Sequence, residues 1–265
     1  AYEFSWNDEL LSLKQFSGIL THAVKSVAHN LDTQVKGVPI VFYNASGFET
    51  TDIVSIEIEA PHFPKEVTVY DEQGKKVNSQ LVSYTDGNVQ LLVEATVPAV
   101  GYVVYDVRLA GSEKEMAITE ATNIENSFYK LMLDENGDIV SLFDKKNNKE
   151  LVKAGKAIRL ALFTENESLS WPAWEVLKKT IDRTPISITS NVKMTLCENG
   201  ELRKTLCVEK SHGGSFFRQY IHLYEGALAH RIDFINEIDW QSANSLLKAE
   251  FPFNLDNEKA TYDLG

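Results

Sequence analysis

The residues best suited to contact a ligand lie together in one short segment, Ser170–Glu175, which follows the polar stretch Glu165–Glu167. The segment carries two indoles and a carboxylate, Trp171, Trp174 and Glu175. An indole offers an apolar face to the C–H groups of a sugar ring, and a carboxylate accepts hydrogen bonds from hydroxyls. These three residues are therefore candidate carbohydrate-binding residues. The competing interpretation is that both tryptophans are core residues that anchor a long loop.

Metal ligands and activated nucleophiles are not apparent. The six histidines lie outside any metal-binding helix motif, and the two cysteines lack zinc-ribbon spacing. His22 and His29 would lie roughly 10 Å apart along a helix axis, too far for one ion, so we interpret them as solvated helix residues. There is no phosphate-binding glycine loop and no Gly-x-Ser-x-Gly nucleophile elbow.

Carboxylates are abundant, but their spacing does not single out a catalytic pair. A retaining glycosidase needs two carboxyl groups within roughly 5 Å of each other. Asp233, Glu237 and Asp239 alternate onto one face of a predicted strand. A hydrated sheet face is the favoured interpretation of that pattern.

The charge balance indicates which classes of binding partner are expected. The chain has 26 Lys and Arg against 38 Asp and Glu, a formal net charge of -12. An acidic surface repels phosphate backbones and anionic headgroups, so neither nucleic acid nor a membrane is expected as a partner. A neutral glycan would not be repelled, and no apolar run is long enough to cross a bilayer.

The two cysteines are predicted to stay reduced. Asn199-Gly200 is a strong signal for a two-residue hairpin turn. That register places Cys197 and Cys207 about five residues apart along the ladder, on the order of 17 Å. This separation is beyond the reach of a disulfide.

The elements that position these residues fall into two kinds. Apolar residues at three- and four-residue steps predict an amphipathic helix over Leu10–Leu31, with Ser5 at a capping-box start and a stop at Gly37–Pro39. From Ile40 the period changes to two, and short, regularly spaced strands predict a small Ig-like β-sandwich over residues 37–110.

Residues 111–121 lack a clear period and are the predicted linker, and residues 122–265 predict a larger antiparallel sandwich. Its first hairpin turns at Asn136-Gly137, and alternation over Tyr220–Tyr224 predicts one buried and one wet face. The last residues begin a new strand-and-turn unit, which suggests that the sandwich is truncated.

Read in order, several segments resemble the C-terminal half of the α-mannosidases of glycoside hydrolase family 38. The helix leading into Val38–Asn44 resembles that family's exit from its helical middle domain, so residues 1–36 would be the end of that domain. Tyr70–Gly74 with Val77–Gln80 is similar to a family hairpin. Ile124–Tyr129 and Gly137–Lys146 resemble the opening of the C-terminal sandwich.

Two segments are more specific. Trp171-Pro172-Ala173-Trp174-Glu175 resembles the family's Trp-Asp-Ala-Trp-Asp segment, with Pro172 in place of the first Asp and Glu175 in place of the second. Asp239-Trp240 with Leu246–Phe253 resembles the run after the long sandwich strands, although Gln241–Ala243 departs from its usual acidic sequence.

The resemblance implies a retaining, exo-acting α-mannosidase with a catalytic zinc. In that family the zinc ligands and the aspartate nucleophile come from an α/β barrel and the start of the helical domain, so no catalytic residue, metal ligand or cofactor is assigned to this chain. The implied partners are a mannose-containing glycan and the N-terminal catalytic barrel.

The resemblance also implies a galactose-mutarotase-like supersandwich from residue 122, whose loops help to wall the substrate cleft. On this hypothesis the chain is inactive alone. The alternatives are a stand-alone, lectin-like carbohydrate-binding module and a purely structural interaction domain.

Overall fold

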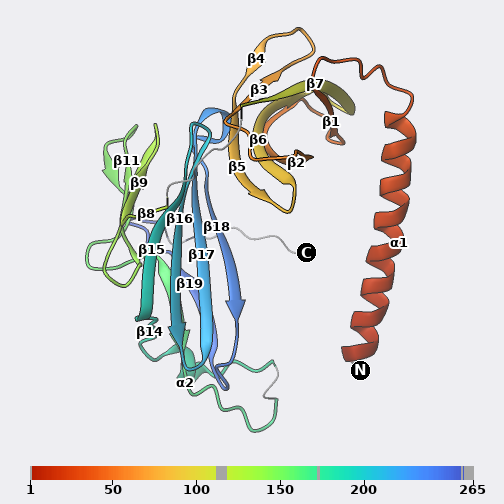
Figure 1. Cartoon of the computed structure of the whole chain (residues 1–265). Coiled ribbons are helices and arrows are strands. Elements are labelled where there is room, and N and C mark those ends of the chain that lie inside the picture. Colours follow the sequence, from red (N-terminus) through yellow and green to blue (C-terminus); the bar gives the residue numbers. More distant parts are fainter. Residues whose placement is uncertain (1, 112–117, 172–173, 258, 260–265) are drawn as a thin grey trace. The chain divides into compact units, whose positions relative to one another are not determined.

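The computed structural model describes residues 2–111, 118–171, 174–257 and 259, and it has a mainly β fold with several antiparallel sheets (Figure 1). This confirms the predicted mainly β fold class with an N-terminal helix. Part of the predicted linker, together with Pro172 and Ala173, lies outside the described residues. By contacts the chain divides into a first unit of residues 1–51, 66–77 and 95–110 and a second of 52–65, 78–94 and 111–265.

The elements, in chain order, are α1 (Tyr2–Ala28), β1 (Val38–Asn44), β2 (Thr50–Glu59), β3 (Glu66–Tyr70), β4 (Lys76–Val77), β5 (Ser79–Thr85), β6 (Asn88–Val97), β7 (Gly101–Ala110), β8 (Thr119–Glu120), β9 (Asn123–Glu125), β10 (Tyr129–Leu133), β11 (Ile139–Asp144), β12 (Lys149–Glu150), β13 (Arg159–Phe163), α2 (Lys178–Ile181), β14 (Ile186–Ser187), β15 (Ser190–Asn199), β16 (Arg203–His212), β17 (Ser215–Tyr224), a 3-10 helix (Gly226–Leu228), β18 (Ile232–Asp239) and β19 (Leu246–Glu250).

The helix of the first unit differs in extent from the prediction. It runs from Tyr2 to Ala28, so Ser5 lies within it and is not its N-cap. None of its residues is buried, and the apolar stripe that includes Leu10 and Phe16 is exposed. No helix among the described residues is both long enough and apolar enough to span a membrane.

The sheet of the first unit has the strand order β1-β7-β3-β4, and its pairs are antiparallel. Val69 of β3 and Val107 of β7 are partners in the ladder, and both are fully buried. Phe42 packs edge-on against Tyr105 with 5.3 Å between the ring centroids. Burial of alternate apolar residues therefore stabilises this sheet on one face.

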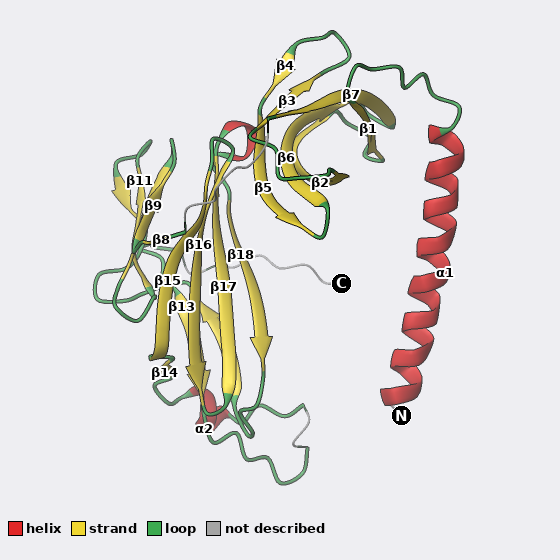
Figure 2. Cartoon of the chain, viewed as in Figure 1, coloured by secondary structure: helices red, strands yellow, loops and turns green. Residues whose placement is uncertain are grey.

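The second unit is built on a sandwich of two antiparallel sheets (Figure 2). One has the order β18-β17-β16-β15-β8, and the other has the order β12-β11-β10-β9. They bury one apolar core, to which Leu131 and Ile139 contribute from the smaller sheet and Leu206 and Ile221 from the larger. A third sheet, β14-β13-β19, is linked to this sandwich by the bridge between Ile139 and Ile158. A fourth sheet has the order β2-β6-β5.

The hairpin β10–β11 confirms the turn predicted at Asn136-Gly137. Gly137 has φ +69°, in the left-handed region that favours glycine. The carboxylate of Asp134 accepts hydrogen bonds from the backbone N–H groups of Asn136 and Asp138, both at 2.9 Å. The backbone conformation of Gly137 and the hydrogen bonds of Asp134 therefore determine this turn.

The register predicted for β15–β16 is wrong. Glu198 pairs with Thr205 and Thr195 with Cys207, with an irregularity between Leu196 and Glu198. The connection is longer than two residues, so Cys197 lies beside Thr205 and its Sγ donates to the Thr205 carbonyl at 3.4 Å. The cysteines are thus about two positions apart along the ladder, not five. Both thiols are free, and burial raises the pKa of the Cys197 thiol to about 11.

The predicted division of β17 into a buried and a wet face is also wrong for its second half. Ile221 and Leu223 face the sandwich core, but His222 and Tyr224 on the opposite face are buried as well. The Tyr224 hydroxyl donates to the carboxylate of Asp233 at 3.0 Å. Neighbouring polar side chains therefore cover a face that alternation alone assigns to solvent.

Candidate functional site

The loop that follows β13 carries all three residues predicted to bind carbohydrate. β13 ends at Phe163, and Glu165 two residues later has φ +61°, in the left-handed region that residues other than glycine rarely adopt. Asn166 then fixes the base of the loop. Its backbone N–H donates to the carbonyl of Asn244 at 2.7 Å, and its side chain bonds to the carbonyl of Glu175 and to the N–H of Leu177. The two ends of the loop are therefore held together by a single amide side chain.

The two indoles stand at the surface of this loop. Their centroids lie 5.6 Å apart with an interplanar angle of 18°, a stacked arrangement. Trp171 is 57% and Trp174 is 68% exposed. The interpretation that they are core residues anchoring the loop is therefore wrong for the described part of the chain. Leu169, in the same loop, is fully exposed.

Ser168 connects the third candidate, Glu175, to the tryptophans. The Ser168 hydroxyl donates to a carboxylate oxygen of Glu175 and accepts the backbone N–H of Trp171 at 3.0 Å. The N–H of Glu175 in turn donates to the carbonyl of Trp171 at 2.9 Å. Ser168 itself is buried, so the contact is part of the loop's framework. The loop thus brings Trp171, Trp174 and Glu175 together, and their role in carbohydrate binding stays a prediction.

The chemistry of this arrangement suits the binding of a ligand. Stacking covers the facing sides of the two rings and leaves their outer faces to pack against C–H groups. A carboxylate beside those faces can orient a hydroxyl.

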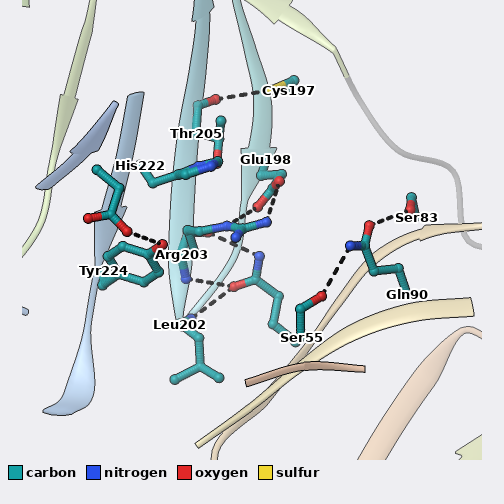
Figure 3. A network of polar contacts seen from close by, with 12 residues as sticks. Ser55, Ser83, Gln90, Cys197, Glu198, Leu202, Arg203, Thr205, His222 and Tyr224 are labelled. Atoms are coloured by element: carbon teal, nitrogen blue, oxygen red, sulfur yellow. Dashed lines mark hydrogen bonds and ion pairs between the residues drawn. The ribbon is translucent and has the colours of Figure 1, made fainter. Parts of the chain in front are cut away.

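The larger sheet carries a polar network that was not predicted from the sequence. Arg203 donates two hydrogen bonds of 2.7 Å to Glu198, and both side chains are largely buried (Figure 3). Beside them a hydrogen bond of 2.7 Å joins the Thr205 hydroxyl to Nδ1 of His222 (Figure 3). Among the described residues, no buried side-chain nitrogen or oxygen lacks a partner. We therefore assign this network to stability.

The acidic residues that alternate along β18 each have a separate partner. Arg231 binds Asp233, Arg218 binds Glu237 at 3.0 Å, and the side chain of Gln241 donates to Asp239. They therefore act as ion-pair and hydrogen-bond acceptors on a sheet face. Within residues 2–111, 118–171, 174–257 and 259, no group of three or more His, Cys, Asp or Glu side chains could hold a metal ion.

Comparison with known proteins assigns the chain to a family. Residues 124–265 match the family described as Glycosyl hydrolases family 38 C-terminal domain. That match covers more than half of the chain, so the chain belongs to glycosyl hydrolase family 38 and carries its C-terminal domain.

Two curated relatives are similar over much of the chain. Alpha-mannosidase G of Dictyostelium discoideum is 26% identical over 250 residues, which cover 85% of this chain and 21% of that protein. Alpha-mannosidase 2C1 of Homo sapiens is 22% identical over 187 residues, which cover 67% of this chain and 18% of that protein. The chain therefore spans about a fifth of the length of these relatives.

Proposed function

We propose that this chain is the C-terminal, non-catalytic region of a retaining, zinc-dependent α-mannosidase that hydrolyses terminal α-mannosides. In this proposal the chain is inactive alone and helps to wall the substrate cleft through Trp171, Trp174 and Glu175. Similarity to two proteins named as α-mannosidases supports the substrate class. The observation that carries the role of the loop is the exposure of two stacked indoles beside a carboxylate held by Ser168.

The zinc of the proposed enzyme belongs to its catalytic barrel. The described residues of this chain do not fit a zinc centre, because they bring no set of three or more ligands together. When bound, the metal supplies Lewis-acid stabilisation of charge in the reaction. The contribution of this chain is to bind and orient the mannoside: the outer indole faces pack against the ring, and Glu175 accepts a hydrogen bond from a hydroxyl.

Kinetics of the full-length enzyme and of the isolated chain test the proposal. We expect turnover of an aryl α-mannoside by the full-length enzyme, loss of turnover on removal of zinc, and no turnover by the chain alone. Measurable turnover by the isolated chain would overturn the division of roles. In the full-length enzyme, Trp174→Ala should lower kcat/KM about tenfold, or roughly 1.4 kcal/mol of transition-state binding.

Leu169→Ala is the matched control, because Leu169 is exposed in the same loop but has no aromatic face. It should leave kcat/KM within about twofold of the unaltered enzyme. Equal losses in both variants would mean that the loop acts only through its overall shape. The same stacked indoles also favour the second candidate, a stand-alone carbohydrate-binding module. Mannose binding by the isolated chain that is lost in Trp174→Ala, with no activity in the full-length protein, would support that module.

A further inference from the structure

A cleft of about 900 Å³ opens in the second unit where β11, β13 and β19 meet. Arg159, at the start of β13, and Glu250, at the end of β19, lie in its wall. Asp138, which precedes β11, lines it too, and Phe251 contributes an aromatic ring. No residue of the loop over Glu165–Glu175 lines this cleft. It is therefore separate from the stacked tryptophans.

The charged groups of the cleft are held in fixed positions by one another. Arg159 donates to Glu250 at 3.0 Å and to the Ser187 hydroxyl at 2.5 Å. The ammonium group of Lys210 donates to the Asp138 carboxylate at 2.5 Å, and both side chains are almost fully buried. A ligand would therefore meet preorganised donors and acceptors, which reduces the ordering cost of binding.

The cleft has no net charge with which to attract an ion. The acids in its wall are Asp134, Asp138 and Glu250, and the bases are Lys156 and Arg159. Lys210, bonded to Asp138, makes three positive charges against three negative charges. An inorganic anion or a metal ion would meet both signs at once. A ligand suited to this wall is neutral and can both donate and accept hydrogen bonds.

The aromatic ring adds a second requirement. Phe251 is 43% exposed, and its edge-on contact with Phe234, with 5.6 Å between centroids, holds it in place. Such a ring can pack against C–H groups of a ligand. Hydroxyls that alternate with C–H faces on a rigid ring are the chemistry of a pyranose. We infer that this cleft binds a neutral monosaccharide unit of a glycan, as a second saccharide site.

Titration of the isolated chain with methyl α-D-mannopyranoside tests this site by NMR. The site should give saturable shifts of the Ser187 and Phe251 amides, with a Kd on the order of 1 mM. Phe251→Leu keeps an apolar contact with Phe234 but removes the ring face, and it should raise Kd about fivefold or more. Phe216→Leu is the matched control, because Phe216 is similarly exposed, at 37%, and does not line the cleft. Trp174→Ala should leave these shifts unchanged.

Three outcomes would overturn the site. The first is the absence of saturable shifts at Ser187 and Phe251 up to about 100 mM, a hundredfold above the expected Kd. The second is an equal rise in Kd for Phe251→Leu and Phe216→Leu. The third is binding that is lost in Trp174→Ala, which would assign it to the loop. None of these outcomes bears on turnover by the full-length enzyme, so this site and the proposed function fail separately.

Discussion

Nδ1 of His222 lies 2.7 Å from the hydroxyl oxygen of Thr205, across the ladder between β17 and β16. Burial, followed by the nearby charge of Arg203, lowers the pKa of His222 to about 4. In the unfolded chain this imidazole takes up its proton near pH 6.5, whereas in the folded chain it stays neutral down to about 4. The contribution of neutral His222 to the unfolding free energy is therefore fully present above pH 6.5 and is lost as the pH falls toward 4.

The difference in pKa corresponds to about 3 kcal/mol across that pH range. His222→Gln removes the titrating group and should flatten the dependence of unfolding free energy on pH between about 6.5 and 4.5. Urea denaturation at several pH values measures this slope. His29→Gln, at an exposed position in the turn after α1, is the control and should leave the slope unchanged. An unaltered slope in His222→Gln would show that other groups cause the acid sensitivity.

The ion pair between Lys210 and Asp138 provides a second test. Their side chains are only 9% and 4% exposed, so removal of one partner leaves a buried charge without compensation. Asp138→Asn should lower the unfolding free energy by about 3 to 5 kcal/mol. Replacement of both, Asp138→Leu with Lys210→Met, should restore most of that loss. Equal destabilisation by the single and double variants would mean that the loss of stability comes from altered packing at this position and not from an uncompensated charge.

Comparison of two glycine turns shows how far the sequence predicts the fold. Asn136-Gly137 forms the predicted hairpin, because its determinants, Asp134 and the left-handed Gly137, are within a few residues. Asn199-Gly200 has an equally strong signal but forms a longer connection. There, Gln80 reaches the turn from 122 residues earlier in the chain and bonds to Leu202. Local spacing cannot reveal such a partner, so the predicted register and the predicted cysteine separation were both wrong.

The candidate site shows the same limit. The sequence grouped Trp171, Trp174 and Glu175 because they are neighbours in it, and they are neighbours in the structure. Their exposure could not be predicted, since a tryptophan in a polar loop is compatible with an anchoring role or a binding role. The part played by Ser168 depends on its burial and on two hydrogen bonds, neither of which has a sequence signature.

The contact of Gln80 with the β15–β16 connection gives a third prediction. Its side chain accepts the N–H groups of Leu202 and Arg203 at 2.9 and 2.7 Å and donates to the Arg203 carbonyl at 3.0 Å. Gln80→Ala leaves the N–H groups of Leu202 and Arg203 without this acceptor, whereas the Arg203 carbonyl still accepts the N–H of Gly200. It should lower the unfolding free energy by about 2 to 3 kcal/mol. Chemical denaturation measures the loss. Gln90→Ala, which removes only contacts to Ser55 and Ser83, should cost about 0.5 kcal/mol or less.

A double-mutant cycle of Gln80 with Gly200 tests the same contact in a second way. A Cβ on Gly200 would lie 2.0 Å from the side-chain carbon Cδ of Gln80, so Gly200→Ala forces the two apart. Once Gln80 is alanine that clash disappears, and Gly200→Ala should then add little further destabilisation. Strictly additive losses would contradict the packing of Gln80 against the turn.

The last prediction concerns Ser168 as a positioning residue of the loop and depends on the proposed function. Ser168→Ala removes the hydroxyl that donates to Glu175 and accepts the Trp171 N–H, so both candidates lose a fixed position. In the full-length enzyme kcat/KM on an aryl α-mannoside should fall about tenfold, with the melting temperature lowered by only a few degrees. Ser168→Thr keeps the hydroxyl and should recover most of the activity. Ser170→Ala, at an exposed position of the same loop, should match the unaltered enzyme. Ser168→Ala kinetics equal to those of Ser170→Ala would show that the hydrogen bonds of Ser168 do not position the residues that contact substrate.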